Sequence, residues 1–324
     1  MANIALIGCG NWGKNLARNL YNLGVLKAIG DADPKIIDWV KKTYEGVKVS
    51  VNYTDIISDP EIKGIIIATP THTHYSLARL ALMAGKHVYV EKPLARGYLQ
   101  AQELNYLASV KGLTLMVGHL LLYHPAVNRL RELIFKGELG DIRFLNSDRR
   151  NFNQKQRRDN NVIWDLAPHD ISMMSYILGL EPQGIVNACG WSTNGDGVID
   201  VAHLDINFPG DIPAHIHNSW IDPQKQVLLT VNGSKKTAVL NDNRQEDKLV
   251  LYSIEDDGAV TVEPYTYSQE EPLTLECKHF LHCIETGEAP RSDGASGYQV
   301  VKILEEAEQK MHVENHKAQT LKFV

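Results

Sequence analysis

The chain has 324 residues, of which 44% are hydrophobic and 22% charged, and its formal net charge is −6. This length suggests about two domains with an apolar core in each, and the composition excludes intrinsic disorder, a fibrous repeat and a disulfide-stapled miniprotein. The excess of acidic residues argues against a dedicated nucleic-acid-binding protein, which needs surplus cations. A small anionic ligand remains compatible with this charge, because binding sites are local.

The cysteines and the first residues indicate a cytoplasmic protein. The four cysteines lack the spacing of a disulfide framework, which fits free thiols in a reducing compartment. The longest apolar stretches, such as Leu113–Tyr123, are shorter than the roughly 20 residues that cross a bilayer. Met1-Ala2-Asn3 leads directly into an apolar run, without the basic region of a signal peptide. We therefore expect no membrane partner.

The first 120 residues alternate short apolar runs with segments of helical spacing. This alternation predicts a mostly parallel sheet with helices on both faces, a Rossmann domain over residues 1–119. The expected strands are Ile4–Ile7, Val25–Gly30, Gly64–Ala68, His87–Val90 and Leu113–Val117.

The remaining residues have a different pattern of helices and strands. Helical patterns around Pro125–Lys136 and Asp165–Leu178 precede a series of strand-like segments separated by turn signals, and two further helical patterns cover about 272–285 and 295–312. The expected strands are Gly184–Ala188, Val201–Phe208, Ala214–Ile221, Val227–Val231, Thr237–Leu240 and Lys248–Ile254. The fold class is thus α/β, with a second, α+β domain over residues 120–324 that contains a large, mostly antiparallel open sheet.

A glycine-rich loop follows the first predicted strand and precedes a helix. The loop reads Gly8-Cys9-Gly10-Asn11-Trp12-Gly13, the G-x-G-x-x-G pattern in the context that pyrophosphate binding requires. Asp31 follows the second strand, eighteen positions after Gly13, where a carboxylate would bind ribose hydroxyls and repel a 2′-phosphate. The pattern therefore predicts a dinucleotide site with NAD favoured over NADP. The alternative is a glycine turn without a ligand.

Two further segments follow the fourth and fifth predicted strands. Thr69-Pro70 and His74 follow one, and Glu91-Lys92-Pro93 follows the other. Ligands bind at the carboxyl ends of parallel strands, so we expect both segments to border the nicotinamide. A lysine there could stabilise the alkoxide that forms as hydride leaves a substrate. The alternative for Glu91 and Lys92 is a solvated pair at a strand end.

A carboxylate and an imidazole lie four residues apart in the segment Trp164-Asp165-Leu166-Ala167-Pro168-His169-Asp170. In a helix that begins at about Asp165, this spacing places Asp165 and His169 on one face, and such a pairing orients a general base. The alternative is a helix cap and a surface histidine.

Together these segments resemble the Gfo/Idh/MocA family of oxidoreductases over nearly the whole chain. The resemblance rests on the order and spacing of the glycine loop, Ala68-Thr69-Pro70 with His74, Gly85-Lys86-His87-Val88 before Glu91-Lys92-Pro93, Gly137-Glu138-Leu139-Gly140, and Asp165-x-x-x-His169. It implies that Lys92 is the active-site lysine, Asp165 its partner and His169 the acid/base, and it suggests a cis Lys92-Pro93 bond. The implied reaction is alcohol oxidation with NAD as hydride acceptor.

The substrate prediction rests on a basic run. Residues 149–158 contain five cations and no acid, and arginine forks suit phosphate oxygens. A solvated basic loop is the alternative. The chain also resembles the family branch that acts on nucleotide sugars, although Leu122 stands where many relatives carry arginine. This resemblance implies oxidation of UDP-N-acetylglucosamine at C3, ahead of a transamination. The expected substrate-binding residues are Lys92, His119, Tyr123, Arg149, Arg150, Asn151, Arg157, Trp164, Asp165 and His169.

Other interpretations stay open. The substrate could be UDP-N-acetylglucosaminuronate or another sugar or polyol, and relatives include NAD-dependent glycosidases and NAD-binding regulators without chemistry. Cys277-x-His279-x-x-His282-Cys283 and His215-x-His217 contain metal-ligand residue types, but their patterns favour core packing and strand surface, so we expect no metal. Packing is likewise favoured over base stacking for Trp12 and Trp164. The open sheet favours a homo-oligomer, a dimer or tetramer.

Overall fold

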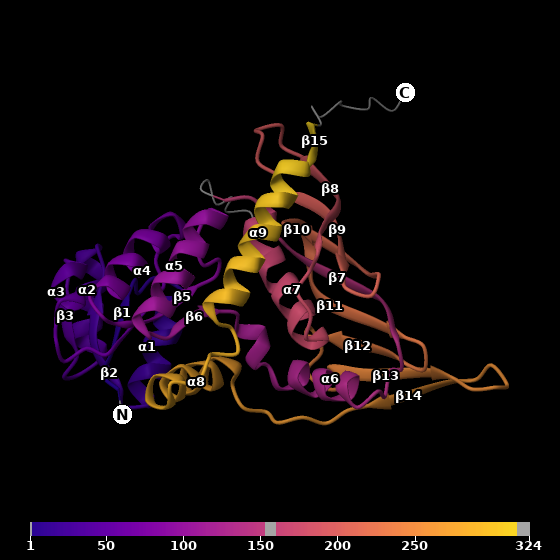
Figure 1. The fold of residues 1–324 in the computed structure, drawn as a ribbon, viewed down its shortest axis with the longest axis horizontal. Coiled ribbons are helices and arrows are strands. Elements are labelled where there is room, and N and C mark those ends of the chain that lie inside the picture. The colour runs from indigo at the N-terminus through magenta and orange to yellow at the C-terminus, as the bar shows by residue number, and fades with distance from the viewer. Residues whose placement is uncertain (1, 153–159, 316–324) are drawn as a thin grey trace. The chain divides into compact units, whose positions relative to one another are not determined.

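The computed structural model describes residues 2–152 and 160–315 (Figure 1). Contacts divide the chain into two compact units. The first contains the residues up to Tyr123 together with Glu270–Val301, and the second contains His124–Gln269 together with the chain from Lys302 onward. The predicted boundary at residue 119/120 assigns 270–301 to the second domain, whereas the structure packs this segment with the N-terminal sheet.

A six-stranded parallel sheet forms the centre of the first unit, in the order β3-β2-β1-β4-β5-β6. Its strands are β1 Ile4–Ile7, β2 Leu26–Gly30, β3 Lys48–Ser50, β4 Gly64–Ile67, β5 His87–Glu91 and β6 Leu115–Gly118. The order reverses direction at β1, as in a doubly wound Rossmann fold. The Rossmann prediction is thereby confirmed. The three-residue strand β3 was not predicted, because it is too short to carry a periodic pattern.

Helices connect these strands on both faces of the sheet. They are α1 Gly13–Asn22, α2 Pro34–Thr43, α3 Tyr53–Ile57, α4 His74–Met83 and α5 Tyr98–Lys111, with short 3₁₀ turns at Thr71–Thr73 and Leu120–Tyr123. Right-handed crossovers place α1 and α4 on opposite faces, because the chain moves away from β1 in one direction and from β4 in the other.

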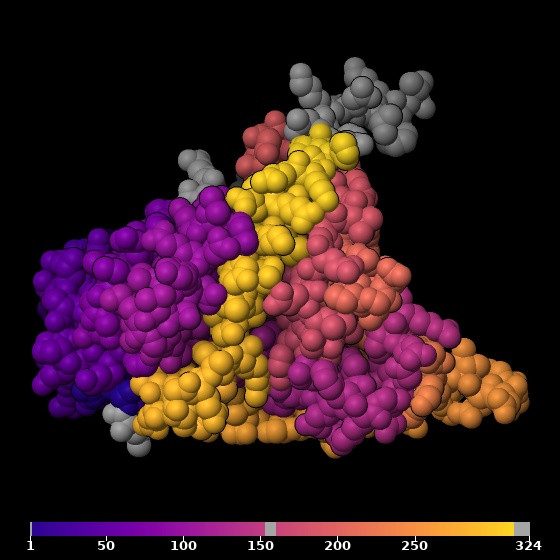
Figure 2. All heavy atoms as spheres, in the orientation of Figure 1, coloured from indigo at the N-terminus to yellow at the C-terminus, as the bar shows by residue number. Residues whose placement is uncertain are grey.

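Helix α8, Pro272–Thr286, returns from the C-terminal part of the chain to complete the first unit. It packs against α1, and Figure 2 shows its orange spheres against the indigo N-terminal segment. The Phe280 ring lies edge-on to Tyr89 of β5, with ring centroids 5.9 Å apart. Helix α8 therefore covers a face of the sheet that the first 123 residues leave open.

The second unit is built on a nine-stranded mixed sheet in the order β14-β13-β12-β11-β7-β10-β9-β8-β15. Its strands are β7 Ile142–Phe152, β8 Gly184–Ser192, β9 Val201–Phe208, β10 Ile212–Ser219, β11 Ile221–Gly233, β12 Thr237–Asn241, β13 Leu249–Ile254, β14 Val260–Pro264 and β15 His312–Asn315. Among the strands that the structure describes in this sheet, only the β10–β7 and β15–β8 pairs are parallel. This confirms the expected mostly antiparallel sheet.

Strand β7 lies in the middle of this sheet, between β11 and β10, although the sequence did not predict it. Its second half, from Asp148 to Asn151, is charged or polar, so no apolar alternation marks it as a strand. Arg149 and Arg150 of the basic run therefore lie on a central strand, which excludes for these two residues the alternative of a solvated loop.

Helices α6, Pro125–Phe135, and α7, Val162–Leu178, pack against each other, and α7 also contacts β7, β9 and β10. Helix α7 begins at Val162, earlier than the predicted start at Asp165, because the Asn161 side chain accepts hydrogen bonds from the Ile163 and Trp164 amides. Helix α9, Gly294–Lys310, follows α8. Over the residues that the structure describes, no helix combines the length and apolarity needed to cross a membrane.

Candidate active site

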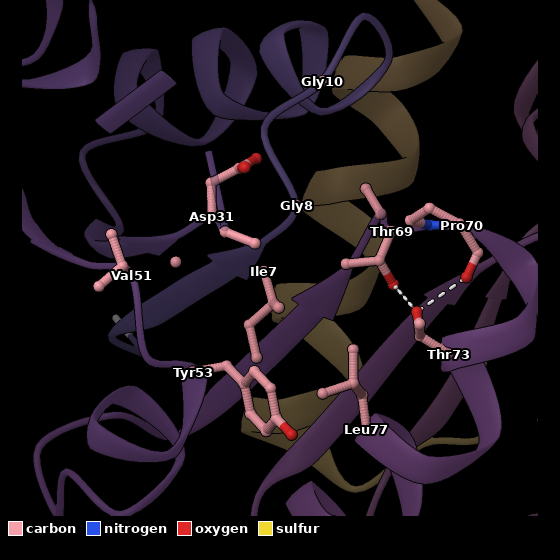
Figure 3. Close-up of a pocket in the computed structure, with 13 residues that line it drawn as sticks. Ile7, Gly8, Gly10, Asp31, Val51, Tyr53, Thr69, Pro70, Thr73 and Leu77 are labelled. Carbon is pink, nitrogen blue, oxygen red and sulfur yellow. Dashed lines mark hydrogen bonds between the residues drawn. The ribbon is translucent and has the colours of Figure 1, made fainter. Parts of the chain in front are cut away.

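A cavity of about 530 Å³ opens at the carboxyl ends of β1, β2 and β4 in the first unit (Figure 3). This volume is within the usual range for small-molecule sites, roughly 300–1,000 Å³. The cavity is lined by residues from the glycine loop and from the segments after β2, β3 and β4: Ile7, Gly8, Gly10, Gly30, Asp31, Ala32, Val51, Tyr53, Ala68, Thr69, Pro70, Thr73 and Leu77.

The backbone at Gly8 requires glycine. Its φ is +90°, and a Cβ atom would lie 2.6 Å from the carbonyl oxygen of Ala68. The loop can therefore pass close to β4 and bring its amides to the cavity edge. Helix α1 begins at Gly13 with no acidic residue in its first turn, so its positive end is not neutralised by a side chain. Both features suit an anionic group beside Gly10.

The Asp31 carboxylate is fixed at the tip of β2. It accepts hydrogen bonds from the Cys9 amide at 2.7 Å and the Asp33 amide at 2.9 Å. Figure 3 shows its side chain directed toward the glycine loop, with Val51 and Tyr53 on the neighbouring segment. No sequence motif pointed to these two residues, because they follow the unpredicted strand β3. Together they give the cavity an apolar wall beside a carboxylate.

The segment after β4 is tied to the segment after β5 by His74. This buried imidazole faces the Pro93 carbonyl through Nδ1 at 2.8 Å and the Thr69 carbonyl through Nε2 at 2.9 Å. Burial lowers the pKa of His74. Thr69 and Thr73 share a hydrogen bond of 2.6 Å beside the cavity. Since both ring nitrogens face carbonyls, His74 contributes to this site by fixing its two segments.

Glu91 and Lys92 lie at the end of β5, and the Lys92-Pro93 peptide is cis, as the resemblance suggests. Glu91 accepts hydrogen bonds from Trp12 Nε1 at 2.6 Å and from the Tyr89 hydroxyl at 3.0 Å. Burial raises the pKa of Glu91, although these hydrogen bonds oppose the rise. Glu91 is therefore not part of a solvated pair. It joins the glycine loop to the strand that carries Lys92.

His119 follows β6 and is almost completely buried. Neither ring nitrogen has a hydrogen-bond partner among the described residues. Burial, with a smaller contribution from nearby Lys92, lowers the pKa of His119 to about 3. The imidazole is therefore neutral and keeps a donor and an acceptor beside Lys92. Tyr123 is also buried, and its hydroxyl lies 3.1 Å from Ser292 Oγ.

In the second unit, α7 carries the expected pair Asp165 and His169, one helical turn apart. Asp165 is buried, and its Oδ2 accepts a hydrogen bond of 3.2 Å from Trp220 Nε1. Trp164 is also buried and donates from Nε1 to Glu308 of α9 at 3.2 Å, which fits packing better than stacking. No sequence motif pointed to Trp220 as a partner of Asp165, since the tertiary fold joins α7 to the end of β10.

Asp170 anchors α7 to the sheet. This fully buried carboxylate accepts hydrogen bonds from Ser147 Oγ at 2.8 Å, Arg149 Nε at 2.9 Å and Asn218 Nδ2 at 3.1 Å. Asp170 was not among the predicted site residues, although it follows His169 directly. The Asp170 anchor, Asp170 with its three donors, fixes the turn of α7 that presents His169.

Arg149 and Arg150 project from opposite faces of β7. Arg149 points to α7 and Asp170, whereas Arg150 bonds Asp148 at 2.7 Å and Asp222 at 2.9 Å. Adjacent strand residues alternate between the two faces, so the two arginines do not converge on one ligand. Asn151 is at the end of β7, and Arg157 lies outside the described residues.

The residues with metal-ligand chemistry pack in other ways. Cys277 and Cys283 are buried on α8, and His279 Nε2 accepts a hydrogen bond from the Arg291 amide at 3.0 Å. His217 stacks on His203, with ring centroids 4.3 Å apart. In the part of the chain that the structure describes, no group of three or more potential ligands is arranged to hold a metal ion.

Two family models match the chain. The model described as "Oxidoreductase family, NAD-binding Rossmann fold" matches residues 2–119, and the model described as "GFO/IDH/MocA C-terminal domain" matches residues 127–239. UDP-N-acetylglucosamine 3-dehydrogenase of Acidithiobacillus ferrooxidans is 34% identical over 122 residues, 38% of either chain. The scyllo-inositol 2-dehydrogenase (NAD(+)) of Bacillus subtilis is 24% identical over 88% of this chain and 87% of the relative.

Solved structures share the complete fold. UDP-N-acetylglucosamine 3-dehydrogenase GnnA from Acidithiobacillus ferrooxidans superposes with a TM-score of 0.86 at 22% identity, covering 95% of this chain and 97% of the relative. The 3-ketoreductase KijD10 from Actinomadura kijaniata, in complex with TDP-benzene and NADP, has a TM-score of 0.82 at 18% identity, covering 96% and 98%. At these identities, the likeness shows the fold alone.

Proposed function

Since this chain belongs to the Gfo/Idh/MocA family of oxidoreductases, we propose that it is an NAD-dependent dehydrogenase that oxidises the C3 hydroxyl of UDP-N-acetylglucosamine. The observation that carries this proposal is the cavity lined by the glycine loop and Asp31. Glu91, the residue before Lys92, is joined to this loop by its hydrogen bond with Trp12. A nicotinamide dinucleotide needs such a combination of phosphate site, ribose acceptor and reactive end.

The residues of the first unit fit NAD. The Gly8–Gly13 loop and the start of α1 would hold the pyrophosphate, Asp31 would accept from the adenosine ribose, and Val51 with Tyr53 would contact the adenine. Thr69 and Pro70 would border the nicotinamide side. When bound, NAD supplies the hydride acceptor of the reaction.

The protein side chains supply the proton chemistry and the charge stabilisation. Lys92 binds the substrate hydroxyl and stabilises the oxygen as negative charge develops on it. His169 takes the hydroxyl proton while the hydrogen on C3 leaves as hydride, and Asp165 orients the imidazole. The Asp165 carboxylate is itself held by Trp220. Neutral His119 supplies a second hydrogen-bonding group beside Lys92. The product is the 3-keto sugar.

The substrate assignment draws on relatives and on the chain's own polar groups. One relative is itself named UDP-N-acetylglucosamine 3-dehydrogenase, and a structural neighbour is a 3-ketoreductase with a TDP-containing ligand. The anionic diphosphate of such a substrate calls for cations and amides. Asn151 keeps a buried amide oxygen without a partner among the described residues, an acceptor that suits a sugar hydroxyl of the substrate rather than its diphosphate. Arg149 belongs to the Asp170 anchor, so its contribution would come from the nitrogens that do not face Asp170.

The activity test is a substrate panel. Incubation with NAD and a set of UDP-sugars and free polyols should produce NADH, followed by its absorbance, with UDP-N-acetylglucosamine as the preferred substrate. A 2-oxo acid should be included as a hydride acceptor, because a tightly retained cofactor could hide turnover. Turnover of free polyols alone would refute the nucleotide-sugar assignment.

Asp31 should set the preference for NAD. In Asp31→Asn the negative charge that would repel a 2′-phosphate is lost, so the ratio of kcat/KM for NADP to that for NAD should rise by roughly 10- to 100-fold. Steady-state kinetics with both cofactors measures this ratio. Asp33→Asn is the matched control, because it removes a charge two residues away at the cap of α2. An equal rise in both variants would assign the effect to net charge rather than to Asp31.

A further inference from the structure

Glu276 of α8 is a carboxyl group buried under the sheet of the first unit, and among the described residues no cation contributes to its pKa. Its exposed fraction is 0%, and its charged neighbour is another carboxylate, Glu91. Burial and this neighbour raise the pKa of Glu276 well above its usual range. An ionised carboxylate in such a place is very costly unless it is paired and hydrogen-bonded.

The hydrogen bonds around Glu276 point to the same protonation state. The Tyr89 hydroxyl is close enough to the Glu276 carboxyl to influence its pKa, but that hydroxyl gives its single proton to Glu91 at 3.0 Å. Neither Glu276 oxygen therefore receives a hydrogen bond from the described residues. A carboxylic acid resolves this conflict, since it can donate its own proton to the free lone pair of the tyrosine oxygen.

We propose that Glu276 is a neutral carboxylic acid that starts a directed chain of hydrogen bonds, through Tyr89 to the Glu91 carboxylate, and that this chain positions the dinucleotide-binding loop. Glu91 receives donors from the other side as well: Trp12 Nε1 at 2.6 Å and the Lys92 amide at 3.3 Å. The proton belongs on Glu276 because Glu91 has these donors and the Lys92 cation nearby, whereas Glu276 has neither.

The proposed chain of hydrogen bonds lies in closely packed surroundings. Tyr89 and Glu91 are two residues apart on β5, so both side chains lie on the face that α8 covers. A Cβ atom on Gly118 of the neighbouring strand β6 would come within 2.7 Å of the Tyr89 hydroxyl oxygen and 2.9 Å of Glu91 Oε1. The β6 backbone therefore packs directly against the Tyr89 hydroxyl and the Glu91 carboxylate, and position 118 has room only for glycine.

Trp12 connects these hydrogen bonds to the dinucleotide-binding loop. This residue immediately precedes α1, and its indole nitrogen is held by Glu91. Glu276 is therefore a positioning residue that keeps Glu91, and with it the glycine loop, in the geometry that binds a dinucleotide. This last step rests on the proposed function, whereas the protonation state of Glu276 does not.

Infrared spectroscopy of the protein without cofactor tests the protonation state. We expect the C=O stretch of a buried carboxylic acid at neutral pH, sensitive to D₂O and lost in Glu276→Gln. A wild-type spectrum with no such band would overturn the proposal. Because this measurement requires no NAD, its result is distinct from any failure of the proposed enzymatic activity.

Three variants test the positioning role through NAD affinity, measured by calorimetry. Glu276→Met removes the donor and keeps the volume, so NAD should bind roughly tenfold more weakly, the size of one lost buried hydrogen bond. Glu276→Gln retains an N–H donor toward Tyr89 and should recover most of the affinity. Tyr89→Phe should lose as much as Glu276→Met, with no further loss in the double variant.

Cys277→Ala, at the next buried position of α8, controls for lost packing and should leave NAD affinity unchanged. If Glu276→Gln loses as much affinity as Glu276→Met, Glu276 acts as an anion and the proposal is wrong. If Cys277→Ala weakens NAD binding as much as Glu276→Met, the effect is structural and the positioning role is overturned.

Discussion

Alanine at Lys92 or at His169 should nearly abolish turnover while NAD still binds. Loss of the lysine removes charge stabilisation from the developing alkoxide, which costs roughly 10²- to 10³-fold in kcat. Loss of the histidine removes the proton acceptor, a contribution of roughly 10²- to 10⁴-fold. Neither side chain lines the cavity around Asp31 and the glycine loop, so NAD affinity should change little. Single-turnover kinetics and calorimetry separate the two quantities.

Lys111→Ala is the matched control for the lysine variant, because this exposed residue ends α5 in the same unit. Its kcat should equal that of the wild type. Wild-type turnover in both Lys92→Ala and His169→Ala would refute the assigned roles. A variant that loses NAD binding as well would instead indicate a folding defect, which circular dichroism would detect.

Removal of Asp170 should destabilise the second unit more than removal of any single surface charge. Asp170→Ala leaves the Arg149 guanidinium buried without its carboxylate, and Ser147 and Asn218 each lose their acceptor. Breaking a buried ion pair in this way costs about 3–5 kcal/mol of unfolding free energy. For a unit of this size the melting temperature should fall by roughly 10 °C, measured by calorimetry.

The neighbouring arginine provides the matched control. Arg150 pairs with Asp222, and these side chains are 31% and 26% exposed, against 11% and 0% for Arg149 and Asp170. Asp222→Ala should therefore cost less than about 1 kcal/mol. The double variant Asp170→Ala with Arg149→Met should recover part of the loss, because no charge is left unpaired. Equal losses in Asp170→Ala and Asp222→Ala would contradict a buried anchor.

Local sequence patterns were enough to predict part of the candidate site. The glycine loop, Asp31 and Thr69 each follow an apolar strand, and the structure brings them to one cavity. Asp165 and His169 lie one turn apart on α7 because the helical period is a property of the local chain. His74 was expected near the cofactor, but its two carbonyl partners come from separate segments that no spacing rule relates.

The basic run shows why residue type alone misleads. Arg149 and Arg150 are adjacent in sequence and were expected to bind the same anion. Their strand places one against Asp170 and the other against Asp148 and Asp222. Had 142–152 been identified as a strand, the alternation would have separated them. Polar Ser147 and charged Arg149 occupy buried positions of this strand and concealed the pattern.

The fold class, the dinucleotide loop and the order of the motifs could be read from the amino-acid pattern, because strand and helix periods and glycine requirements act over a few residues. Which distant groups meet depends on how the strands and helices pack. This packing brought α8 under β5, so that Glu276 reaches Tyr89, and it placed Asp170 beneath Arg149 and Trp220 beside Asp165. These contacts join residues far apart in the chain, and the requirement to satisfy buried polar groups selects them only after the strands have packed.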